Sequence, residues 1–194
     1  MRRIALLGLT VLAASAFVHT SIPVRDTHVN GATTPVDDSR VIDTNGVTRL
    51  NGVPFTGMLR TRYESGAVKR LASYREGRLE GLARGWYANG SPSYIRTYWL
   101  GREEGVHRGW WENGAAKFIY NFHDGKAEGL SREWFEDGSA FTEFHFVAGH
   151  EAGSQRMWTP YGKLRANYVI RDGRRFGLMG SMGCQDKQAK AEQS

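Results

Sequence analysis

One arginine recurs at a constant interval through most of the chain. Successive copies are 24 residues apart, and four of the five stand two residues before a tryptophan. The set is Arg60, Arg84, Arg108, Arg132 and Arg156. Guanidinium groups bind carboxylates and phosphates through paired hydrogen bonds, so such a series could form a cationic ladder for phospholipid head groups, acidic glycans or an acidic partner.

A structural role for the same arginines is the alternative interpretation. Each arginine could stack on the tryptophan two residues later, and these tryptophans are Trp86, Trp110, Trp134 and Trp158. Each could also pair with a turn carboxylate such as Glu80, Glu104 or Glu128. Strict repetition favours this structural role, because a position that recurs in every repeat usually does what every repeat needs.

A cluster of sulfur side chains lies near the end of the sequence, at Met179, Met182 and Cys184. Thioether and thiolate donors suit Cu(I), and a histidine could add a further ligand, the candidates being His123, His145 and His150. The same residues suit a terminal strand whose methionines cover the last edge of a sheet. Cys184 is the single cysteine, so it forms no disulfide within the chain and could instead link to a partner. No resident cofactor is expected.

Motifs of the common enzyme classes are missing from the sequence. It contains no HExxH, no GxSxG, no GxxxxGK and no GxGxxG. The carboxylates concentrate at expected turns, and the six histidines do not recur at one position of the repeat. The sequence therefore predicts a protein that is not an enzyme.

Glycines show which elements must position these side chains. Three glycine series share the 24-residue interval and account for sixteen of the 24 glycines. They are Gly57, Gly81, Gly105, Gly129, Gly153 and Gly177; Gly66, Gly90, Gly114, Gly138 and Gly162; and Gly77, Gly101, Gly125, Gly149 and Gly173. Self-similarity at one period is the signature of a repeat array.

Each 24-residue unit holds two strand-length segments. The first ends in ESG, ANG, ENG, EDG or PYG, and the second ends in a turn such as EGRLEG or DGKAEG. Asn-Gly and Asp-Gly predict type I′ hairpin turns, while Pro160 in the last unit predicts an edge or a distorted hairpin. Glycine or proline interrupts every boundary, so strands are favoured over helices. We expect an all-β fold, an elongated antiparallel β-meander of about five tandem 24-residue β-hairpin repeats.

The alternation of side chains along a strand assigns them to two faces. The arginines share one face with the tryptophans two residues later, while the opposite face of the same segment carries Tyr63, Tyr87, Trp111 and Phe135. We expect the aromatic rings to stack into columns across neighbouring strands. Equivalent strands lie two strand spacings apart, so the arginines should recur about every 10 Å.

The repeat resembles a known family. The stretches GLARGWYANG, GVHRGWWENG and GLSREWFEDG follow the pattern GxxRxWYxxG, and each precedes an aromatic strand and xxGxxEG. This pattern, with the opening stretch LNGVPFTG, resembles the MORN-repeat variant of bacteria over about residues 46 to 177. The resemblance implies a β-meander of hairpins, and members of the family are labelled as antitoxins or as membrane-binding proteins.

The N-terminus predicts export. Arg2 and Arg3 precede an apolar run, and Ala14-Ser15-Ala16 forms a small-x-small cleavage signal, so residues 1–16 are expected to be a signal peptide. A flexible lead over residues 17–45, a repeat array over 46–184 and a polar tail over 185–194 complete the expected organisation. The expected location is the periplasm of a bacterium or its exterior. The net charge of +6 is spread along the chain, and no nucleic-acid partner is expected.

The sequence thus predicts an exported, non-catalytic repeat scaffold that binds a protein or an envelope surface, with the arginine and tryptophan series as its binding residues. Two alternatives stay open. One is a copper-handling accessory protein that uses Met179, Met182 and Cys184. The other is peripheral binding to an anionic membrane through the arginine ladder.

Overall fold

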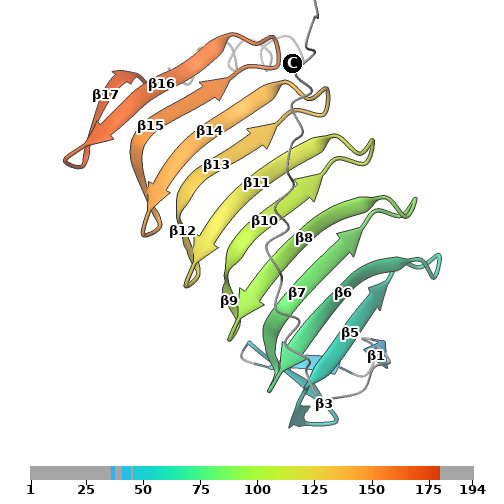
Figure 1. The fold of residues 1–194 in the computed structure, drawn as a ribbon. Coiled ribbons are helices and arrows are strands. Elements are labelled where there is room, and N and C mark those ends of the chain that lie inside the picture. The colour runs from blue at the N-terminus through green and yellow to red at the C-terminus, as the bar shows by residue number, and fades with distance from the viewer. Residues whose placement is uncertain (1–35, 38–40, 45, 180–194) are drawn as a thin grey trace, which may run out of the picture.

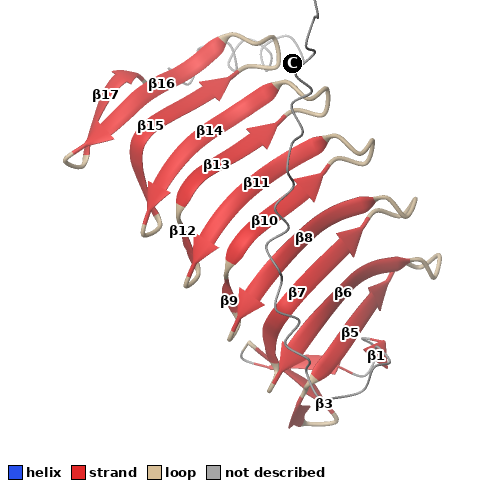
Figure 2. Cartoon of the chain, viewed as in Figure 1, coloured by secondary structure: helices blue, strands red, loops and turns tan. Residues whose placement is uncertain are grey.

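The chain forms one long, twisted β-sheet with a small sheet at its N-terminal end (Figure 1). The computed structural model describes residues 36–37, 41–44 and 46–179. Within these ranges all regular secondary structure is β-strand (Figure 2). The predicted all-β antiparallel meander is confirmed. The expected lead over residues 17–45 includes two short strands, and the expected signal peptide and polar tail lie outside the described residues.

The long sheet has 14 strands. They are β1 (Val36–Asp37), β5 (Gly57–Arg62), β6 (Val68–Arg75), β7 (Arg78–Trp86), β8 (Pro92–Trp99), β9 (Arg102–Glu103), β10 (Gly105–Trp110), β11 (Ala116–His123), β12 (Lys126–Ala127), β13 (Gly129–Trp134), β14 (Ala140–Val147), β15 (His150–Trp158), β16 (Leu164–Arg171) and β17 (Arg174–Leu178). From β5 onward the neighbours are antiparallel and follow chain order, whereas β1 pairs with β5 in parallel. The small sheet contains β2 (Val41–Thr44), β3 (Val47–Leu50) and β4 (Val53–Pro54).

Two-residue turns connect the strands at one side of the sheet. In the turn after β11, Asp124 has φ 50° and Gly125 has φ 75°, and the flanking residues His123 and Lys126 are cross-strand partners. Positive φ at both central residues is the type I′ pattern, whose twist matches that of the strands. The same pattern recurs at Glu76-Gly77, Leu100-Gly101, Ala148-Gly149 and Asp172-Gly173.

The turns at the other side are of a different type, so the type I′ prediction for ANG, ENG and EDG is wrong. Among the three central residues of such a turn only the glycine has positive φ, as at Gly114 with φ 85°. The Gly114 N–H donates to the Trp111 carbonyl at 2.9 Å, and the Trp111 N–H donates to the Ala115 carbonyl at 2.8 Å. This is a type I turn followed by a left-handed glycine. The Asn113 side chain accepts the Ala115 N–H at 2.9 Å, which explains the preference for Asn or Asp before the glycine.

Pro160 occupies a turn of this same type, so the expected distortion is also wrong. The Gly162 N–H donates to the Thr159 carbonyl at 2.9 Å, and the Thr159 N–H donates to the Lys163 carbonyl at 2.8 Å. Proline is favoured at the second position of a type I turn, where its backbone nitrogen has no ladder bond to make.

A glutamate in the bulge of one unit binds the turn of the next unit. Three residues of β7, from Glu80 to Leu82, oppose Ser73 of β6, and this bulge contains the left-handed Gly81. The Glu80 carboxylate accepts the Leu100 N–H at 2.8 Å. Equivalent bonds join Glu104 to the Asp124 N–H at 2.9 Å and Glu128 to the Ala148 N–H at 2.7 Å. We call these three glutamates the glutamate ladder.

A second set of bonds connects the units at the type I turns. The hydroxyl of Tyr63 donates to the Trp86 carbonyl at 2.8 Å, and that of Tyr87 donates to the Trp110 carbonyl at 2.8 Å. The indole N–H of Trp111 donates to the Trp134 carbonyl at 3.0 Å. The expected stacking of these aromatics into columns is therefore wrong. Units two strand spacings apart are too distant for ring contact, and polar ring atoms bridge them instead.

The face opposite the arginines is the more deeply buried one, and we call it the aromatic face. At its N-terminal end Phe55, Leu59, Ala72, Tyr74 and Ala83 form a buried cluster, against which Leu50 of the small sheet packs. Further along, the Phe118 and Tyr120 rings stack with centroids 4.5 Å apart. The small sheet therefore caps the apolar end of the aromatic face.

Some cross-strand pairs on the aromatic face combine a small residue with a large one. Gly85 faces Tyr94, and Gly109 faces Phe118. In the last equivalent pair the sizes are exchanged, since Met157 faces Ala166. A Cβ atom at Gly109 would lie 2.1 Å from Cε1 of Phe118, so the ring occupies the space above the glycine.

We predict that Gly109→Ala destabilises the sheet by about 1–3 kcal/mol, because the ring must move out of a packed position. Urea unfolding measures this change. In a Phe118→Ala background the same glycine substitution should cost much less, because the new methyl group then has room. Equal costs in the two backgrounds would contradict the packing described above.

Candidate functional site

The predicted arginines lie in one continuous row across the sheet. Each arginine is the cross-strand partner of the residue before and after it in the row, which reads Asp37, Arg60, Leu71, Arg84, Ile95, Arg108, Ile119, Arg132, Glu143, Arg156 and Asn167. We call this the arginine row, and the face that carries it the arginine face. The structure therefore brings all five predicted arginines together on one face.

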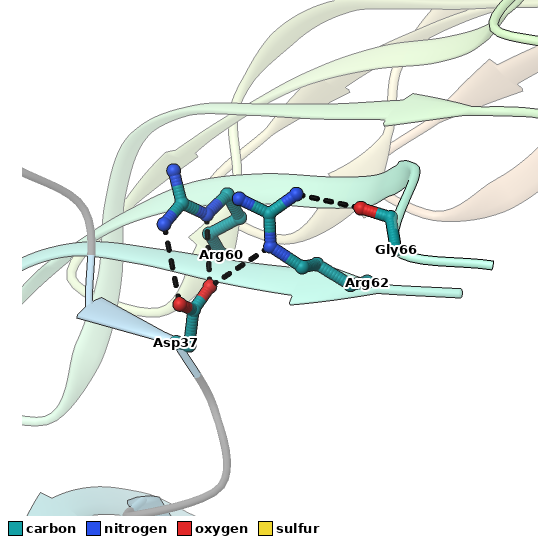
Figure 3. A network of polar contacts seen from close by, with 4 residues as sticks. All are labelled: Asp37, Arg60, Arg62 and Gly66. Carbon is teal, nitrogen blue, oxygen red and sulfur yellow. Dashed lines mark hydrogen bonds and ion pairs between the residues drawn. The ribbon is translucent and has the colours of Figure 1, made fainter. Parts of the chain in front are cut away.

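The N-terminal end of the row is neutralised by Asp37 (Figure 3). The Arg60 guanidinium donates from Nε to Oδ1 at 2.8 Å and from Nη2 to Oδ2 at 3.2 Å, and Arg62 donates from Nε to Oδ1 at 3.3 Å. The hydrogen bond from Arg60 is the main reason why the pKa of Asp37 lies below its usual value. Arg62 also donates to the Gly66 carbonyl at 2.6 Å. Asp37 thus engages two cations at once.

At the C-terminal end of the row, Glu143 binds two arginines. Arg132 donates from Nε to Oε2 of this carboxylate at 3.0 Å, and Nη2 of Arg156 lies 3.5 Å from Oε1. Glu143 is the cross-strand partner of both arginines, so the ladder itself holds the three side chains in register. A single carboxylate again serves two guanidinium groups.

The centre of the row differs from both ends. Arg84 and Arg108 are exposed, and no acidic side chain within the described part of the chain lies within ion-pair distance of either. Their cross-strand partners are the half-buried aliphatic residues Leu71, Ile95 and Ile119. We call these five residues the central arginine surface. It presents two free cations separated by an apolar side chain.

The structural interpretation of the arginine series fails in its two specific forms. Glu80, Glu104 and Glu128 accept turn N–H groups rather than pairing with the row. No cation–π contact joins an arginine of the row to a tryptophan among the described residues.

The four predicted tryptophans lie beside the row and are half-buried. Trp86 lines a shallow apolar hollow of about 430 Å³ together with Val68, Leu71 and Arg60. The hollow adjoins the N-terminal end of the row, where Arg60 is already bound to Asp37. Trp86 therefore adds apolar surface to the arginine face without holding a charged group.

Two residues of the row were missed by sequence reasoning. Glu143 occupies the repeat position at which the preceding units have Leu71, Ile95 and Ile119. An alignment of the units would have shown this acidic residue between two arginines of the row. Asp37 precedes the repeat, and only the pairing of β1 with β5 brings it to Arg60. No sequence signal indicated this contact.

The sulfur cluster is only partly visible. Met179 is exposed, while Met182 and Cys184 lie outside the described residues. Within the described ranges no three His, Cys, Asp or Glu side chains gather as a metal site would require. His123 pairs with Glu104 at 3.1 Å, and His145 contacts the Ser154 carbonyl at 3.0 Å. The copper hypothesis stays a prediction from the sequence.

A buried imidazole lies on the aromatic face. His107 is 1% exposed, and its Nε2 lies 2.9 Å from the Thr97 carbonyl. The Tyr98 and Phe122 rings flank it, with centroids 5.7 and 4.8 Å away. Burial lowers the pKa of His107 most, Arg96 lowers it further, and the Thr97 carbonyl and Glu103 oppose the shift. His107 is thus a packed side chain whose burial favours the neutral form.

Comparison with known proteins adds no assignment. No protein-family model matches the chain, and no curated protein matches it. Among the described residues no helix is long and apolar enough to cross a membrane. The resemblance to the MORN-repeat variant therefore stays a prediction, and function has to be argued from the arginine face.

We predict that acid destabilises the fold through His107. The folded pKa lies below the unfolded value of about 6.5, so the unfolded chain binds more protons and stability falls as pH drops below that value. His107→Gln is the comparison variant, because Gln155 is buried at the equivalent position. Urea unfolding from about pH 7.5 to about pH 5 should show a steeper loss for the wild type. His123, whose pKa Glu104 raises, acts oppositely but equally in both proteins. Parallel pH profiles would show that His107 does not control the acid response.

Proposed function

We propose that this chain is a non-catalytic scaffold that binds an acidic surface of a partner protein through the central arginine surface. The observation that carries the proposal is the contrast within the arginine row. Both ends bind carboxylates of the chain itself, whereas Arg84 and Arg108 expose the same group without an acidic partner in the described residues.

The composition of the central arginine surface supports a protein partner. Exposed arginines beside half-buried aliphatic and tryptophan side chains are typical of the residues that dominate protein interfaces. Ile95 lies between Arg84 and Arg108 and could be covered by an apolar side chain of the partner. The surrounding strands hold these residues in fixed register, which reduces the entropy lost on binding.

The small number of arginines without a carboxylate partner favours a protein partner over an anionic membrane. Asp37 and Glu143 bind the three outer arginines and lower the net charge of the row from +5 to +3, so the predicted ladder presents two guanidinium groups without a carboxylate partner among the described residues. A basic residue near an anionic membrane contributes only about 1 kcal/mol. Two such residues give weak membrane binding, while paired bonds to carboxylates of a protein give more per group.

The chemistry of the other polar side chains supports a non-catalytic role. The glutamate ladder serves turns, His107 is buried, and Tyr120 donates to Glu133 within the aromatic face. Burial and Glu133 raise the pKa of Tyr120 far above its usual value, which keeps its proton in place. An exported location remains part of the proposal and rests on the sequence of residues 1–16.

We predict that Arg84→Gln combined with Arg108→Gln abolishes partner capture. The immobilised wild-type chain should retain a protein from a bacterial extract, and the double variant should retain roughly tenfold less or lower still. Arg171→Gln with Arg174→Gln is the matched control, since it removes two exposed charges from the far end of the same face.

Quantitative mass spectrometry of the retained proteins measures the difference. Equal retention by the wild type and both variants would refute the proposed site. Arginine-dependent sedimentation with anionic vesicles, without any arginine-dependent protein, would favour the membrane alternative instead.

A further inference from the structure

We infer that the partner presents carboxylates about 10 Å apart, with an aliphatic side chain between them, on a segment that runs along the array and across its strands. This inference rests on the proposed function and specifies the chemistry of its ligand. It follows from the spacing of the row, from the two carboxylates already bound in it, and from the residue that separates Arg84 and Arg108.

The spacing is fixed by the sheet. Ile95 is the cross-strand partner of both Arg84 and Arg108, so the two arginines stand two strand spacings apart. With a strand spacing of about 4.8 Å their Cα atoms are about 10 Å apart. A ligand that engages both guanidinium groups must match this interval.

The bound carboxylates show what the row accepts. Asp37 receives two hydrogen bonds from Arg60, and Glu143 receives Arg132 from one side and Arg156 from the other. Both acids come from strands of the sheet, at positions that Leu71, Ile95 and Ile119 occupy in the centre. A carboxylate for Arg84 or Arg108 must therefore approach from above the arginine face.

The residues between the central arginines define the rest of the ligand. A carboxylate or phosphate directly above Ile95 would lose hydration without gaining a partner. An aliphatic side chain there would bury apolar area against Ile95 and leave the flanking acids to the arginines. Phosphate-rich ligands are therefore disfavoured relative to an acidic segment with alternating apolar residues.

Two ordinary backbone conformations match the spacing of the arginines. Seven residues of an α-helix advance about 10.5 Å and return to the same side, so Glu at i and i+7 with Leu at i+3 places both acids and the apolar side chain on one side. Three residues of a polyproline II helix advance about 9.3 Å, so Glu at i and i+3 share a side, while a Leu between them is turned about 120° away and contacts Ile95 only from the flank. Either segment would run along the array, as ligands of repeat proteins commonly do.

The test uses synthetic peptides and the full-length chain. One helical and one proline-rich peptide carry the spacings above, and each has a counterpart of equal composition in which one Glu is moved to the opposite side. Fluorescence anisotropy measures binding to the wild type, to Arg84→Gln with Arg108→Gln, and to the control Arg171→Gln with Arg174→Gln. Arg84→Lys with Arg108→Lys tests whether the paired hydrogen bonds matter beyond charge.

At least one spaced peptide should bind the wild type and the control variant. The same peptide should bind the Gln double variant at least tenfold more weakly. The rearranged counterpart of that peptide should also bind the wild type at least tenfold more weakly. The affinity of the Lys double variant for the spaced peptide should lie between those of the wild type and the Gln double variant. Circular dichroism and urea melts show that each variant is folded.

Failure of both spaced peptides, or equal binding of the rearranged ones, would overturn the inference. So would binding of anionic vesicles that depends on Arg84 and Arg108 in the absence of peptide binding. If the peptides fail while arginine-dependent capture of a protein succeeds, the scaffold function stands and only this ligand geometry is wrong. If arginine-dependent capture also fails, the proposed function fails as well.

Discussion

The array depends on a hydrogen bond from a backbone N–H to a carboxylate that is repeated every 24 residues. Glu80, Glu104 and Glu128 each accept the first N–H of the next two-residue turn, and the turn glycine donates to a carbonyl of the same preceding unit, as Gly125 does to Glu103 at 2.9 Å. The bond from the Asp124 N–H is the main cause of the lowered pKa of Glu104. A lone hairpin is marginal in water, so bonds between hairpins are what make the sheet stable. They also fix the register on which the arginine row depends.

Because the strand register places equivalent residues of successive units in one row, a difference at a single repeat position determines whether the neighbouring arginines of the arginine face are paired within the chain. One position of the repeat is occupied by Leu71, Ile95 and Ile119 in three successive units and by Glu143 in the next. Because this residue is a glutamate, Arg132 and Arg156 both form ion pairs with it within the chain. At the other end β1 brings Asp37 to Arg60 in the same row. Within the arginine row, the arginines without an acidic partner among the described residues therefore lie at the centre because of the side chains that neighbour them, and not because of any change in the arginines themselves. A scaffold built from similar units can in this way carry a local binding surface.

Much of the fold could be predicted from the glycine interval, and less of the site. The strands, the two kinds of turn boundary and the placement of the arginines on one face follow from a period that is visible in the sequence. The turn type at one kind of boundary was predicted wrongly. Asn113-Gly114 is typical of a type I′ turn, but the loop here has three residues and requires positive φ only at Gly114. Stacking of Tyr87 on Trp111 was expected without allowing for a gap of two strands, which polar ring atoms bridge. The neutralisation of Arg60 by Asp37 depends on a contact between distant segments that carries no local signal.

Amide hydrogen exchange tests the central claim, that the glutamate ladder holds successive hairpins together. The measurement compares the wild type with Glu104→Ala, using NMR to follow the N–H groups of Leu100, Asp124 and Ala148. The account predicts that Asp124 exchanges roughly fivefold faster or more in the variant, the equivalent of about 1 kcal/mol for one lost hydrogen bond. Leu100 and Ala148 should change little, because Glu80 and Glu128 still accept their N–H groups. Unchanged exchange at Asp124 would contradict the claim.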